Sequence, residues 1–289
     1  MKHLSKARAN FVRIEPNPSP PNPLSHTERG RIGLYDSGVG GLSVLRAVTN
    51  ELPAHDVIYF ADQKYCPYGP RPPQEIRALS ARIAKFLIEQ NCRVIVVACN
   101  TASAAALYFL RESFPDIFFV GMEPAVKPAA SATRSGKIAV LATQGTLDGE
   151  LFANTRDEFA REVQVQTGYP PDWVERVERG EIASDETYES VRRVIEPLLD
   201  AGVDEIALGC THYPFLIPVI EKITQGRATI LDPSNAVARQ TARVVQEHMP
   251  QKSNSPTQTF YTSGNAQEFA RVLNRLTGHQ AARVYHSDI

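Results

Sequence analysis

Short apolar runs alternate with longer segments of mixed polarity from residue 31 to the end of the chain. The apolar runs predict strands, which we place at Ile32–Tyr35, Val57–Phe60, Arg93–Ala98, Phe118–Gly121, Lys137–Ala142, Val163–Thr167, Glu205–Gly209, Thr229–Leu231 and Thr259–Thr262. Helices are expected between them, and these include Leu42–Asn50, Gln74–Gln90, Thr101–Phe114, Asp148–Arg161, Thr187–Ala201 and Ala266–Leu276. Strands that alternate with helices are typical of parallel sheets with helices on both faces. The pattern therefore predicts an α/β fold.

One local pattern occurs twice in the chain. The stretches "RVIVVACNTAS" (93–103) and "EIALGCTHYPF" (205–215) each place a cysteine and small polar residues directly after a buried strand. The two cysteines, Cys99 and Cys210, are 111 residues apart (210 minus 99). We interpret this repeat as a distant internal duplication, which predicts two similar parallel-sheet domains related by pseudo-symmetry. Ligands bind beyond the carboxyl ends of parallel strands, so the active site is expected in the cleft between the domains.

The domain boundaries follow from the same pattern. Residues 31–122 together with 233–289 are predicted to form the domain that carries Cys99, and residues 123–232 the domain that carries Cys210. Ahead of both, the stretch "EPNPSPPNPLSHTERG" contains five prolines and little apolar content. Such a composition cannot build a core, so residues 1–30 are predicted to be a disordered or extended tail.

Composition and charge narrow the function classes. The 289-residue chain is 43% hydrophobic and 22% charged, with a formal net charge of −1. This balance argues against a nucleic acid or an acidic membrane surface as partner. No apolar run approaches the ~20 residues of a membrane span, and the N-terminus has no apolar core of the signal-peptide kind. None of the four cysteines forms a CxxC pair, so we expect no metal cage and a reducing, cytoplasmic compartment.

Cys99 and Cys210 are the first candidates for chemistry. A lone cysteine often only fills space in a core, but a cysteine between a strand and a helix meets backbone N–H groups that favour a thiolate. Asn100 and Thr101 follow Cys99, and Thr211 and His212 follow Cys210. The histidine could shuttle the proton of the adjacent thiol. A single cysteine in such a position could serve packing alone, but two cysteines in matching positions are much less expected from packing.

The glycine-rich turn "DSGVGG" (36–41) is the next candidate. It lacks the Gly-Lys-Ser/Thr of a P-loop and the third glycine of a dinucleotide site, so phosphate binding is disfavoured. Asp36 and Ser37 could instead face the cleft, where the carboxylate could take an ammonium group or influence a nearby thiol. The plainer alternative is turn and N-cap chemistry.

Three other features are weaker. The proline-flanked loop "CPYGPRP" (66–72) could offer the Tyr68 hydroxyl and a backbone N–H of Gly69, or it could be an ordinary turn. Cys66 and Cys92 do not stand at a helix start, and we interpret both as structural. Glu178 lies in "WVERVERGE", and a charged helical segment is usually a solvated face. Spacing alone does not select it.

Two thiols that face one small polar cleft allow three kinds of chemistry. They could form a redox disulfide, one could act as a nucleophile with a histidine, or both could act as an acid–base pair on opposite faces of one carbon. A carbon between two thiols at near-attack distance implies sulfurs roughly 7 Å apart, too far for a disulfide. The third arrangement inverts a stereocentre and suits a duplicated fold. It also requires stabilisation of a carbanion by aimed hydrogen bonds.

Several motifs together resemble the cofactor-independent aspartate/glutamate racemase family, in its glutamate branch: "YDSGVGGLSVL", "PYG", "ACNTAS", "GMEPAVKPA", "GCTHYPFL" and "FYTSG". They cover about residue 31 to the C-terminus. The resemblance implies two α/β domains and interconversion of L- and D-glutamate, a building block of bacterial peptidoglycan. It also implies that no cofactor such as pyridoxal phosphate takes part, and a homodimer fits it.

The resemblance also assigns roles to residues. It implies that Cys99 and Cys210 are the acid–base pair, that Asp36 assists Cys99, and that His212 and Glu178 assist Cys210. The residues that it implies for substrate binding are Asp36, Ser37, Tyr68, Gly69, Asn100, Thr101, Thr211 and His212.

Three rival functions stay open at this point. The nearest is an aspartate racemase on the same scaffold, although "CTHYP" at 210–214 favours the glutamate branch over relatives with "CTE". The second is a thiol oxidoreductase, and the third is a non-catalytic amino-acid-binding protein. The presence of both cysteines disfavours the third.

Overall fold

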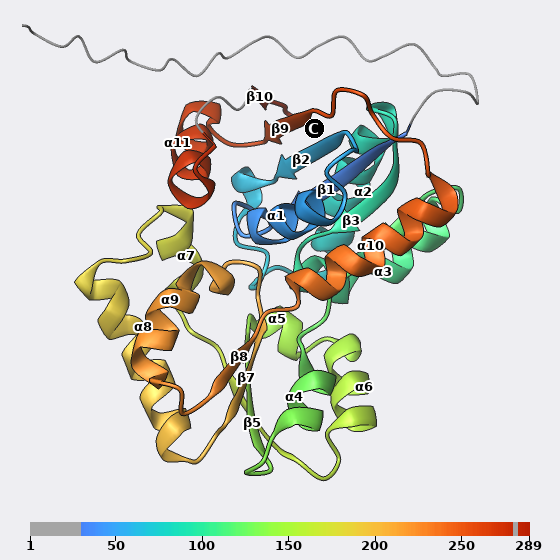
Figure 1. Cartoon of the computed structure of the whole chain (residues 1–289). Coiled ribbons are helices and arrows are strands. Elements are labelled where there is room, and N and C mark those ends of the chain that lie inside the picture. Colours follow the sequence, from blue (N-terminus) through green and yellow to red (C-terminus); the bar gives the residue numbers. More distant parts are fainter. Residues whose placement is uncertain (1–29, 280–282) are drawn as a thin grey trace, which may run out of the picture.

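The computed structural model describes residues 30–279 and 283–289, so the tail predicted for residues 1–30 lies outside the described residues apart from Gly30. The described strands form two sheets in which all neighbouring strands run parallel. The larger sheet has the order β10-β9-β2-β1-β3-β4, and the smaller has the order β6-β5-β7-β8 (Figure 1). The predicted class, two parallel-sheet α/β domains, is confirmed.

All nine predicted strands are present, with ends that differ from the prediction by at most one residue. The strands are β1 Arg31–Asp36, β2 Val57–Ala61, β3 Cys92–Val97, β4 Phe118–Val120, β5 Lys137–Ala142, β6 Gln164–Gly168, β7 Glu205–Gly209, β8 Thr229–Leu231, β9 Gln258–Thr262 and β10 Val284–His286. Only β10 was not predicted. Continuous apolar runs identify buried parallel strands well.

The six predicted helices are present with ends within two residues of the prediction. The α-helices are α1 Leu42–Glu51, α2 Pro73–Glu89, α3 Asn100–Ser113, α4 Val126–Ala132, α5 Gln144–Leu147, α6 Glu150–Phe159, α7 Trp173–Glu178, α8 Asp185–Asp200, α9 Ile217–Thr224, α10 Ser234–His248 and α11 Ala266–Thr277. Two short 3₁₀ turns, η1 Gln63–Tyr65 and η2 Tyr213–Leu216, follow strands. The prediction did not include α4, α5, α9 and α10, and it described the segment of α7 as helical without giving its ends.

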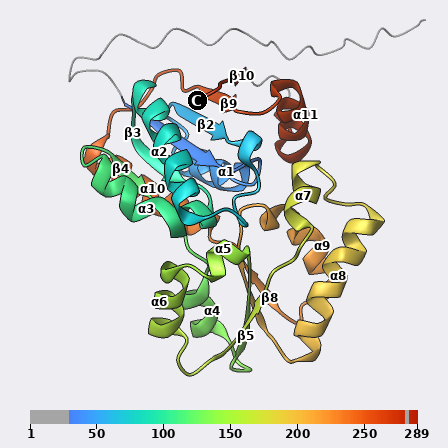
Figure 2. The same ribbon diagram turned by 180° about the vertical axis from the view of Figure 1, so that it is seen from behind.

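Successive side chains of the larger sheet point to opposite faces and join different cores. In β2, Val57 and Tyr59 pack with α1, α10 and α11, whereas Ile58 and Phe60 pack with α2 and α3. Figure 1 has α1, α10 and α11 toward the viewer, and Figure 2 brings α2 and α3 forward. Both faces are therefore covered, as the long apolar strands require.

The smaller sheet is built in the same way. In β5, Ala139 and Leu141 pack toward α8 and α9, and Ile138 and Val140 pack toward α4 and α6. The chain passes between the sheets twice, after β4 and again after β8. The chain thus leaves the larger sheet after β4 and returns to it after β8. The exact domain boundaries, at residues 122/123 and 232/233, stay a prediction.

The arrangement brings the carboxyl ends of both sheets toward each other. Residues directly after β1, β3, β5 and β7 line one cavity between them, and α5 lies at this junction (Figure 2). Within the described ranges, no helix combines the length and the apolar content needed to cross a membrane.

Candidate active site

The cavity between the sheets collects most of the predicted site residues. Its lining comprises Ser37, Pro67, Tyr68, Gly69, Cys99, Asn100, Thr101, Thr143, Val174, Cys210, Thr211 and His212. The volume that a water molecule can occupy there is only about 10 Å³, roughly room for one water. The protein is therefore in a closed form, and an amino acid can enter only if the lining residues move apart.

Cys99 stands between β3 and α3. Its backbone is extended (φ −145°, ψ 120°), and α3 begins at the next residue. The thiol is buried, and burial together with the nearby charge of Asp36 raises the pKa of Cys99 well above its ordinary value. The backbone N–H of Ala102 acts in the opposite direction but does not reverse the shift. The helix start does favour a thiolate here, as expected, but burial and a neighbouring acid outweigh it.

Asp36 organises the turn after β1. One of its oxygens accepts from the backbone N–H of Ser37 at 2.7 Å, and the other accepts from the N–H of Gly41 at 2.6 Å and from Oγ1 of Thr211 at 3.2 Å. Burial raises the pKa of Asp36, although the charge of His212 and a hydrogen bond with Cys99 oppose the shift. Asp36 is fully buried and does not line the cavity. In this structure it contacts the thiol of Cys99 rather than the open space.

Cys210 occupies the matching position after β7 and is paired with a histidine. The Sγ atom of Cys210 lies 3.6 Å from Nδ1 of His212, and Nε2 of the same ring lies 2.6 Å from Oε1 of Glu178. Burial alone would lower the pKa of His212, but hydrogen bonds with Cys210, Cys66 and Glu178 raise it well above its ordinary value. The imidazole can therefore carry a proton between the Cys210 thiol and the Glu178 carboxylate.

Glu178, at the end of α7, connects this pair to the larger sheet. Its Oε1 also accepts from the backbone N–H of Val39 at 2.7 Å, and its Oε2 accepts from Nε2 of Gln63 at 3.0 Å. Burial alone would raise the pKa of Glu178, but the hydrogen bond and the charge of His212 lower it below its ordinary value. The family resemblance predicted a role for Glu178 in the site. The charged helical segment in which it lies gave no such indication.

Two glycines allow the turn after β1 to approach this pair. A Cβ atom at Gly38 would overlap the carboxylate of Glu178, and one at Gly40 would overlap Nδ1 of His212. The glycines of "DSGVGG" therefore serve close backbone approach rather than phosphate binding.

Asn100 lines the cavity with an unused amide. The side chain is buried, and neither its oxygen nor its nitrogen has a hydrogen-bond partner in the described chain. Buried polar groups are nearly always paired, because an unpaired one costs about 1–3 kcal/mol. This amide is therefore available to a polar ligand in the cavity.

Next to Asn100, Thr101 and Thr143 also line the cavity and belong to a cluster of threonine hydroxyls. The hydroxyl of Thr101, at the start of α3, lies 2.7 Å from that of Thr143, and Thr143 lies 2.9 Å from Thr146 on α5. These hydroxyls join the two sheets across the cavity. Thr143 was not among the predicted residues, although it follows β5 in the same way that Cys99 follows β3.

Tyr68 is held from behind by a second buried acid. Its hydroxyl donates to Oδ2 of Asp62 at 2.5 Å, and Ser263 donates to the other oxygen at 2.7 Å. The Tyr68 hydroxyl was expected to bind the substrate, but in this structure it donates its hydrogen bond to Asp62. The ring and the neighbouring Gly69 still line the cavity.

All four cysteines are free thiols, and the two without a predicted role differ in location. Cys92 is buried in β3, where burial raises its pKa to about 12. Burial and the charge of Glu178 likewise raise the pKa of Cys66 to about 12. Cys66, however, lies beside His212 and Glu178, a proximity that its sequence position did not reveal.

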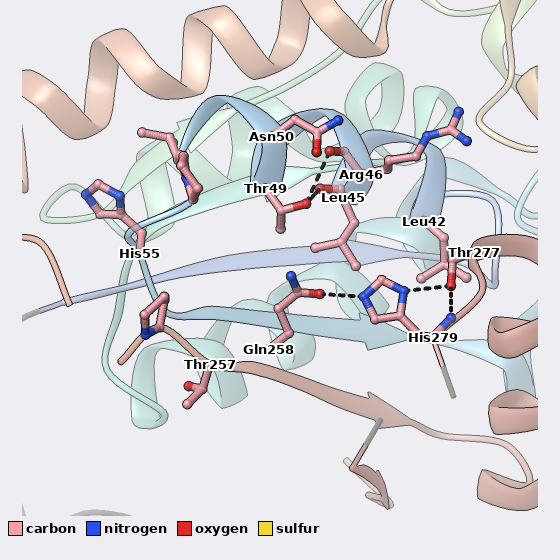
Figure 3. A pocket seen from close by; sticks show the side chains of 13 residues that line it. Leu42, Leu45, Arg46, Thr49, Asn50, His55, Thr257, Gln258, Thr277 and His279 are labelled. Carbon is pink, nitrogen blue, oxygen red and sulfur yellow. Dashed lines mark hydrogen bonds between the residues drawn. The ribbon is translucent and has the colours of Figure 1, made fainter. Parts of the chain in front are cut away.

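A larger hollow of about 310 Å³ lies along α1 (Figure 3). His279 bonds Gln258 at 3.2 Å and Thr277 at 2.9 Å there. Its lining contains no thiol and no carboxylate side chain. The two thiols of the predicted acid–base pair thus line the smaller cavity and not this hollow.

Relatives in sequence identify the family of the chain. The sequence profile of the Asp/Glu/Hydantoin racemase family matches residues 40–241. A glutamate racemase of Roseiflexus sp. (strain RS-1) is 48% identical over 248 residues, which cover 85% of this chain and 91% of the relative.

Solved structures agree with the sequence relatives. Escherichia coli glutamate racemase, in complex with L-glutamate and the activator UDP-MurNAc-ala, is similar at a TM-score of 0.80 and 30% identity, over 90% of this chain and 98% of that one. Glutamate racemase from Francisella tularensis subsp. tularensis SCHU S4, in complex with D-glutamate, has a TM-score of 0.78 and 26% identity over the same shares. The predicted resemblance is confirmed: the chain belongs to the Asp/Glu/Hydantoin racemase family.

Proposed function

We propose that the protein is a glutamate racemase that interconverts L- and D-glutamate with two cysteines and no cofactor. One observation carries the proposal: Cys99 and Cys210, each at the carboxyl end of a strand in a different sheet, line the same cavity. A carbon bound between them has one thiol on each face. Aspartate racemisation is the nearest alternative on this scaffold.

The reaction needs two proton transfers. The thiolate on one face takes the α-proton, so that the Cα–H bond breaks and an S–H bond forms. The thiol on the other face then gives its proton to the same carbon, so that its S–H bond breaks and a Cα–H bond forms with inverted configuration. Because either thiol can start, the same site serves both enantiomers.

The side chains that contact the two thiols determine how readily each thiol gains or loses a proton. Cys99 has its pKa raised by burial and by Asp36, which favours the protonated thiol, and Asp36 can accept that proton when Cys99 acts as the base. Cys210 exchanges its proton with His212, whose imidazolium form is stabilised by Glu178. General acid–base groups of this kind typically contribute about 10²–10⁴-fold in rate.

The polar lining supports amino-acid binding. The unpaired amide of Asn100 and the hydroxyls of Thr101, Thr143 and Thr211 offer donors and acceptors for carboxylate and ammonium groups. Two relatives of this fold are described in complex with L-glutamate and with D-glutamate. Water exclusion in the closed cavity strengthens the hydrogen bonds that stabilise negative charge at the α-carbon.

The proposed cellular role is the supply of D-glutamate for peptidoglycan synthesis, in the cytoplasm. A homodimer stays a prediction.

The decisive experiment is incubation of the purified protein with L-glutamate in heavy water without added cofactor. We expect D-glutamate labelled with deuterium at the α-carbon, read by mass spectrometry and by circular dichroism. Aspartate and glutamate are compared in parallel. Labelling of aspartate alone would show that the protein is an aspartate racemase. Labelling of neither amino acid would overturn the proposal.

A further inference from the structure

Three donor atoms converge beside Cys210. The Sγ atom of Cys66, a ring nitrogen of His212 and a carboxylate oxygen of Glu178 all lie within 4.8 Å of one another. They come from the loop after η1, from the turn after β7 and from the end of α7. Because the three residues are far apart in sequence, no short motif such as CxxC announces the cluster.

The donor set matches the preferences of a borderline-soft divalent cation. A thiolate, an imidazole and a carboxylate are the ligands that bind Zn²⁺, at about 2.3 Å for sulfur and about 2.0–2.2 Å for nitrogen and oxygen. In a tetrahedral site such ligands are about 3.3–3.8 Å apart, by geometry from those bond lengths. The cluster therefore needs only small side-chain movements to enclose an ion, and a fourth position stays open.

Charge and access also favour a cation. Glu178 and Asp36 both exert their negative charge on the Cys66 thiol, and the opposing positive charge of His212 is lost when that ring releases its proton to bind the ion. Cys66 and Glu178 are partly exposed, and the Glu178 side chain retains 17% exposure, so an ion can reach the cluster from solvent. His212 is buried behind them.

We propose that Cys66, His212 and Glu178 form a binding site for a thiophilic divalent cation such as Zn²⁺, and that an ion bound there blocks racemisation. As the ion binds, the Cys66 thiol and the ring nitrogen of His212 that faces Glu178 each release a proton to solvent, and the 2.6 Å contact between His212 and Glu178 opens. His212 then no longer relays a proton for Cys210. Binding is independent of the proposed function, whereas the inhibition rests on it.

The two catalytic thiols are the competing ligands. Cys99 and Cys210 line the neighbouring cavity, and a thiophilic ion held between them would also inhibit. The competing site uses two sulfurs, whereas the proposed site uses one. Counting the sulfur ligands therefore separates the two.

The first test counts ligands on the unaltered protein. Zinc X-ray absorption spectroscopy with one equivalent of Zn²⁺ is expected to show one sulfur at about 2.3 Å and nitrogen or oxygen ligands at about 2.0–2.2 Å. Two sulfurs, or none, would overturn the proposal. Because this measurement needs no enzymatic activity, its outcome stands even if the protein does not racemise glutamate.

The second test uses Cys66→Ser with Cys92→Ala as matched control, since each removes one thiol outside the proposed acid–base pair. We expect Cys66→Ser to racemise glutamate and to need at least about tenfold more Zn²⁺ for half-inhibition, as loss of a ligand implies. Co²⁺ bound to the wild type should give a thiolate charge-transfer band that this variant lacks. Cys92→Ala should retain both the band and wild-type zinc sensitivity. Equal zinc sensitivity of Cys66→Ser and wild type would contradict the site.

Discussion

The Nε2 atom of His212 lies 2.6 Å from Oε1 of Glu178, and this contact fixes the imidazole with Nδ1 toward Cys210. The same carboxylate oxygen accepts the N–H of Val39 from the larger sheet. One side chain on α7 thus positions the histidine and also joins the smaller sheet's half of the site to the turn after β1.

Glu178→Gln should lower kcat by about 10²-fold, because the amide cannot stabilise the protonated imidazole that relays the Cys210 proton. KM should change little, since Glu178 does not line the cavity. Circular dichroism of the glutamate enantiomers measures both parameters.

Glu175→Gln is the matched control for this change. Glu175 is exposed on the same helix, so the net charge of α7 changes equally while the histidine contact is kept. A control that loses as much kcat as Glu178→Gln would show that the effect is a general one of charge.

Gly40→Ala should reduce kcat by about 10²-fold, a size typical of a displacement of catalytic groups by about 1 Å. The added Cβ would overlap Nδ1 of His212 and crowd Oγ1 of Thr211, so the ring must leave its place beside Cys210. Thermal unfolding, followed by circular dichroism in parallel, tells displacement from loss of the fold. A variant with wild-type kcat would show that the turn yields without moving the histidine.

Asp62→Asn should change how stability depends on pH. Burial raises the pKa of Asp62 above its ordinary value, although Tyr68 and Ser263 donate to it. The folded protein therefore holds this proton more tightly than the unfolded chain, so the stabilisation is present below the unfolded pKa of about 3.9 and is lost as pH rises through the folded value.

The measurement is the free energy of unfolding by urea at several pH values from about 4 to 7, where linkage applies. As pH rises through this range, the stability of wild type relative to Asp62→Asn should fall. A constant difference between the two proteins would mean that the pKa of Asp62 is not raised in the fold.

The fold class and the two thiols could be predicted because they depend on local signals. Continuous apolar runs identify buried strands, and Cys99 and Cys210 each follow such a run directly. The ligand-binding edge of a parallel sheet is set by topology, so the residues after each strand could be placed before the structure was known.

The rest depends on contacts between distant segments. Cys66 gained its importance only when the loop after β2 packed against His212, and Asp62 gained its importance when Ser263 came beside it from the far end of the chain. The helix α10 buries Val237, Ala238, Thr241 and Val245 at helical spacing, a pattern present in the sequence that the prediction missed. The raised pKa of Cys99 follows from burial beside Asp36, which sequence cannot show.

Cys99→Ala and Cys210→Ala should each abolish racemisation, because one face of the α-carbon then lacks its proton donor. Each variant keeps one thiol, which can still remove and return a proton on its own face. In heavy water, each variant is therefore expected to exchange the α-proton of only one enantiomer, and the two variants should select opposite enantiomers.

Proton NMR of L- and D-glutamate, each incubated with each variant, measures this exchange directly. Cys92→Ala serves as control because it removes a buried thiol that does not line the cavity, and it should exchange both enantiomers. If Cys99→Ala and Cys210→Ala exchanged the same enantiomer, the thiols could not stand on opposite faces of the carbon. Racemisation by either variant at the wild-type rate would remove that cysteine from the reaction, because an alanine methyl group can neither take nor give the proton.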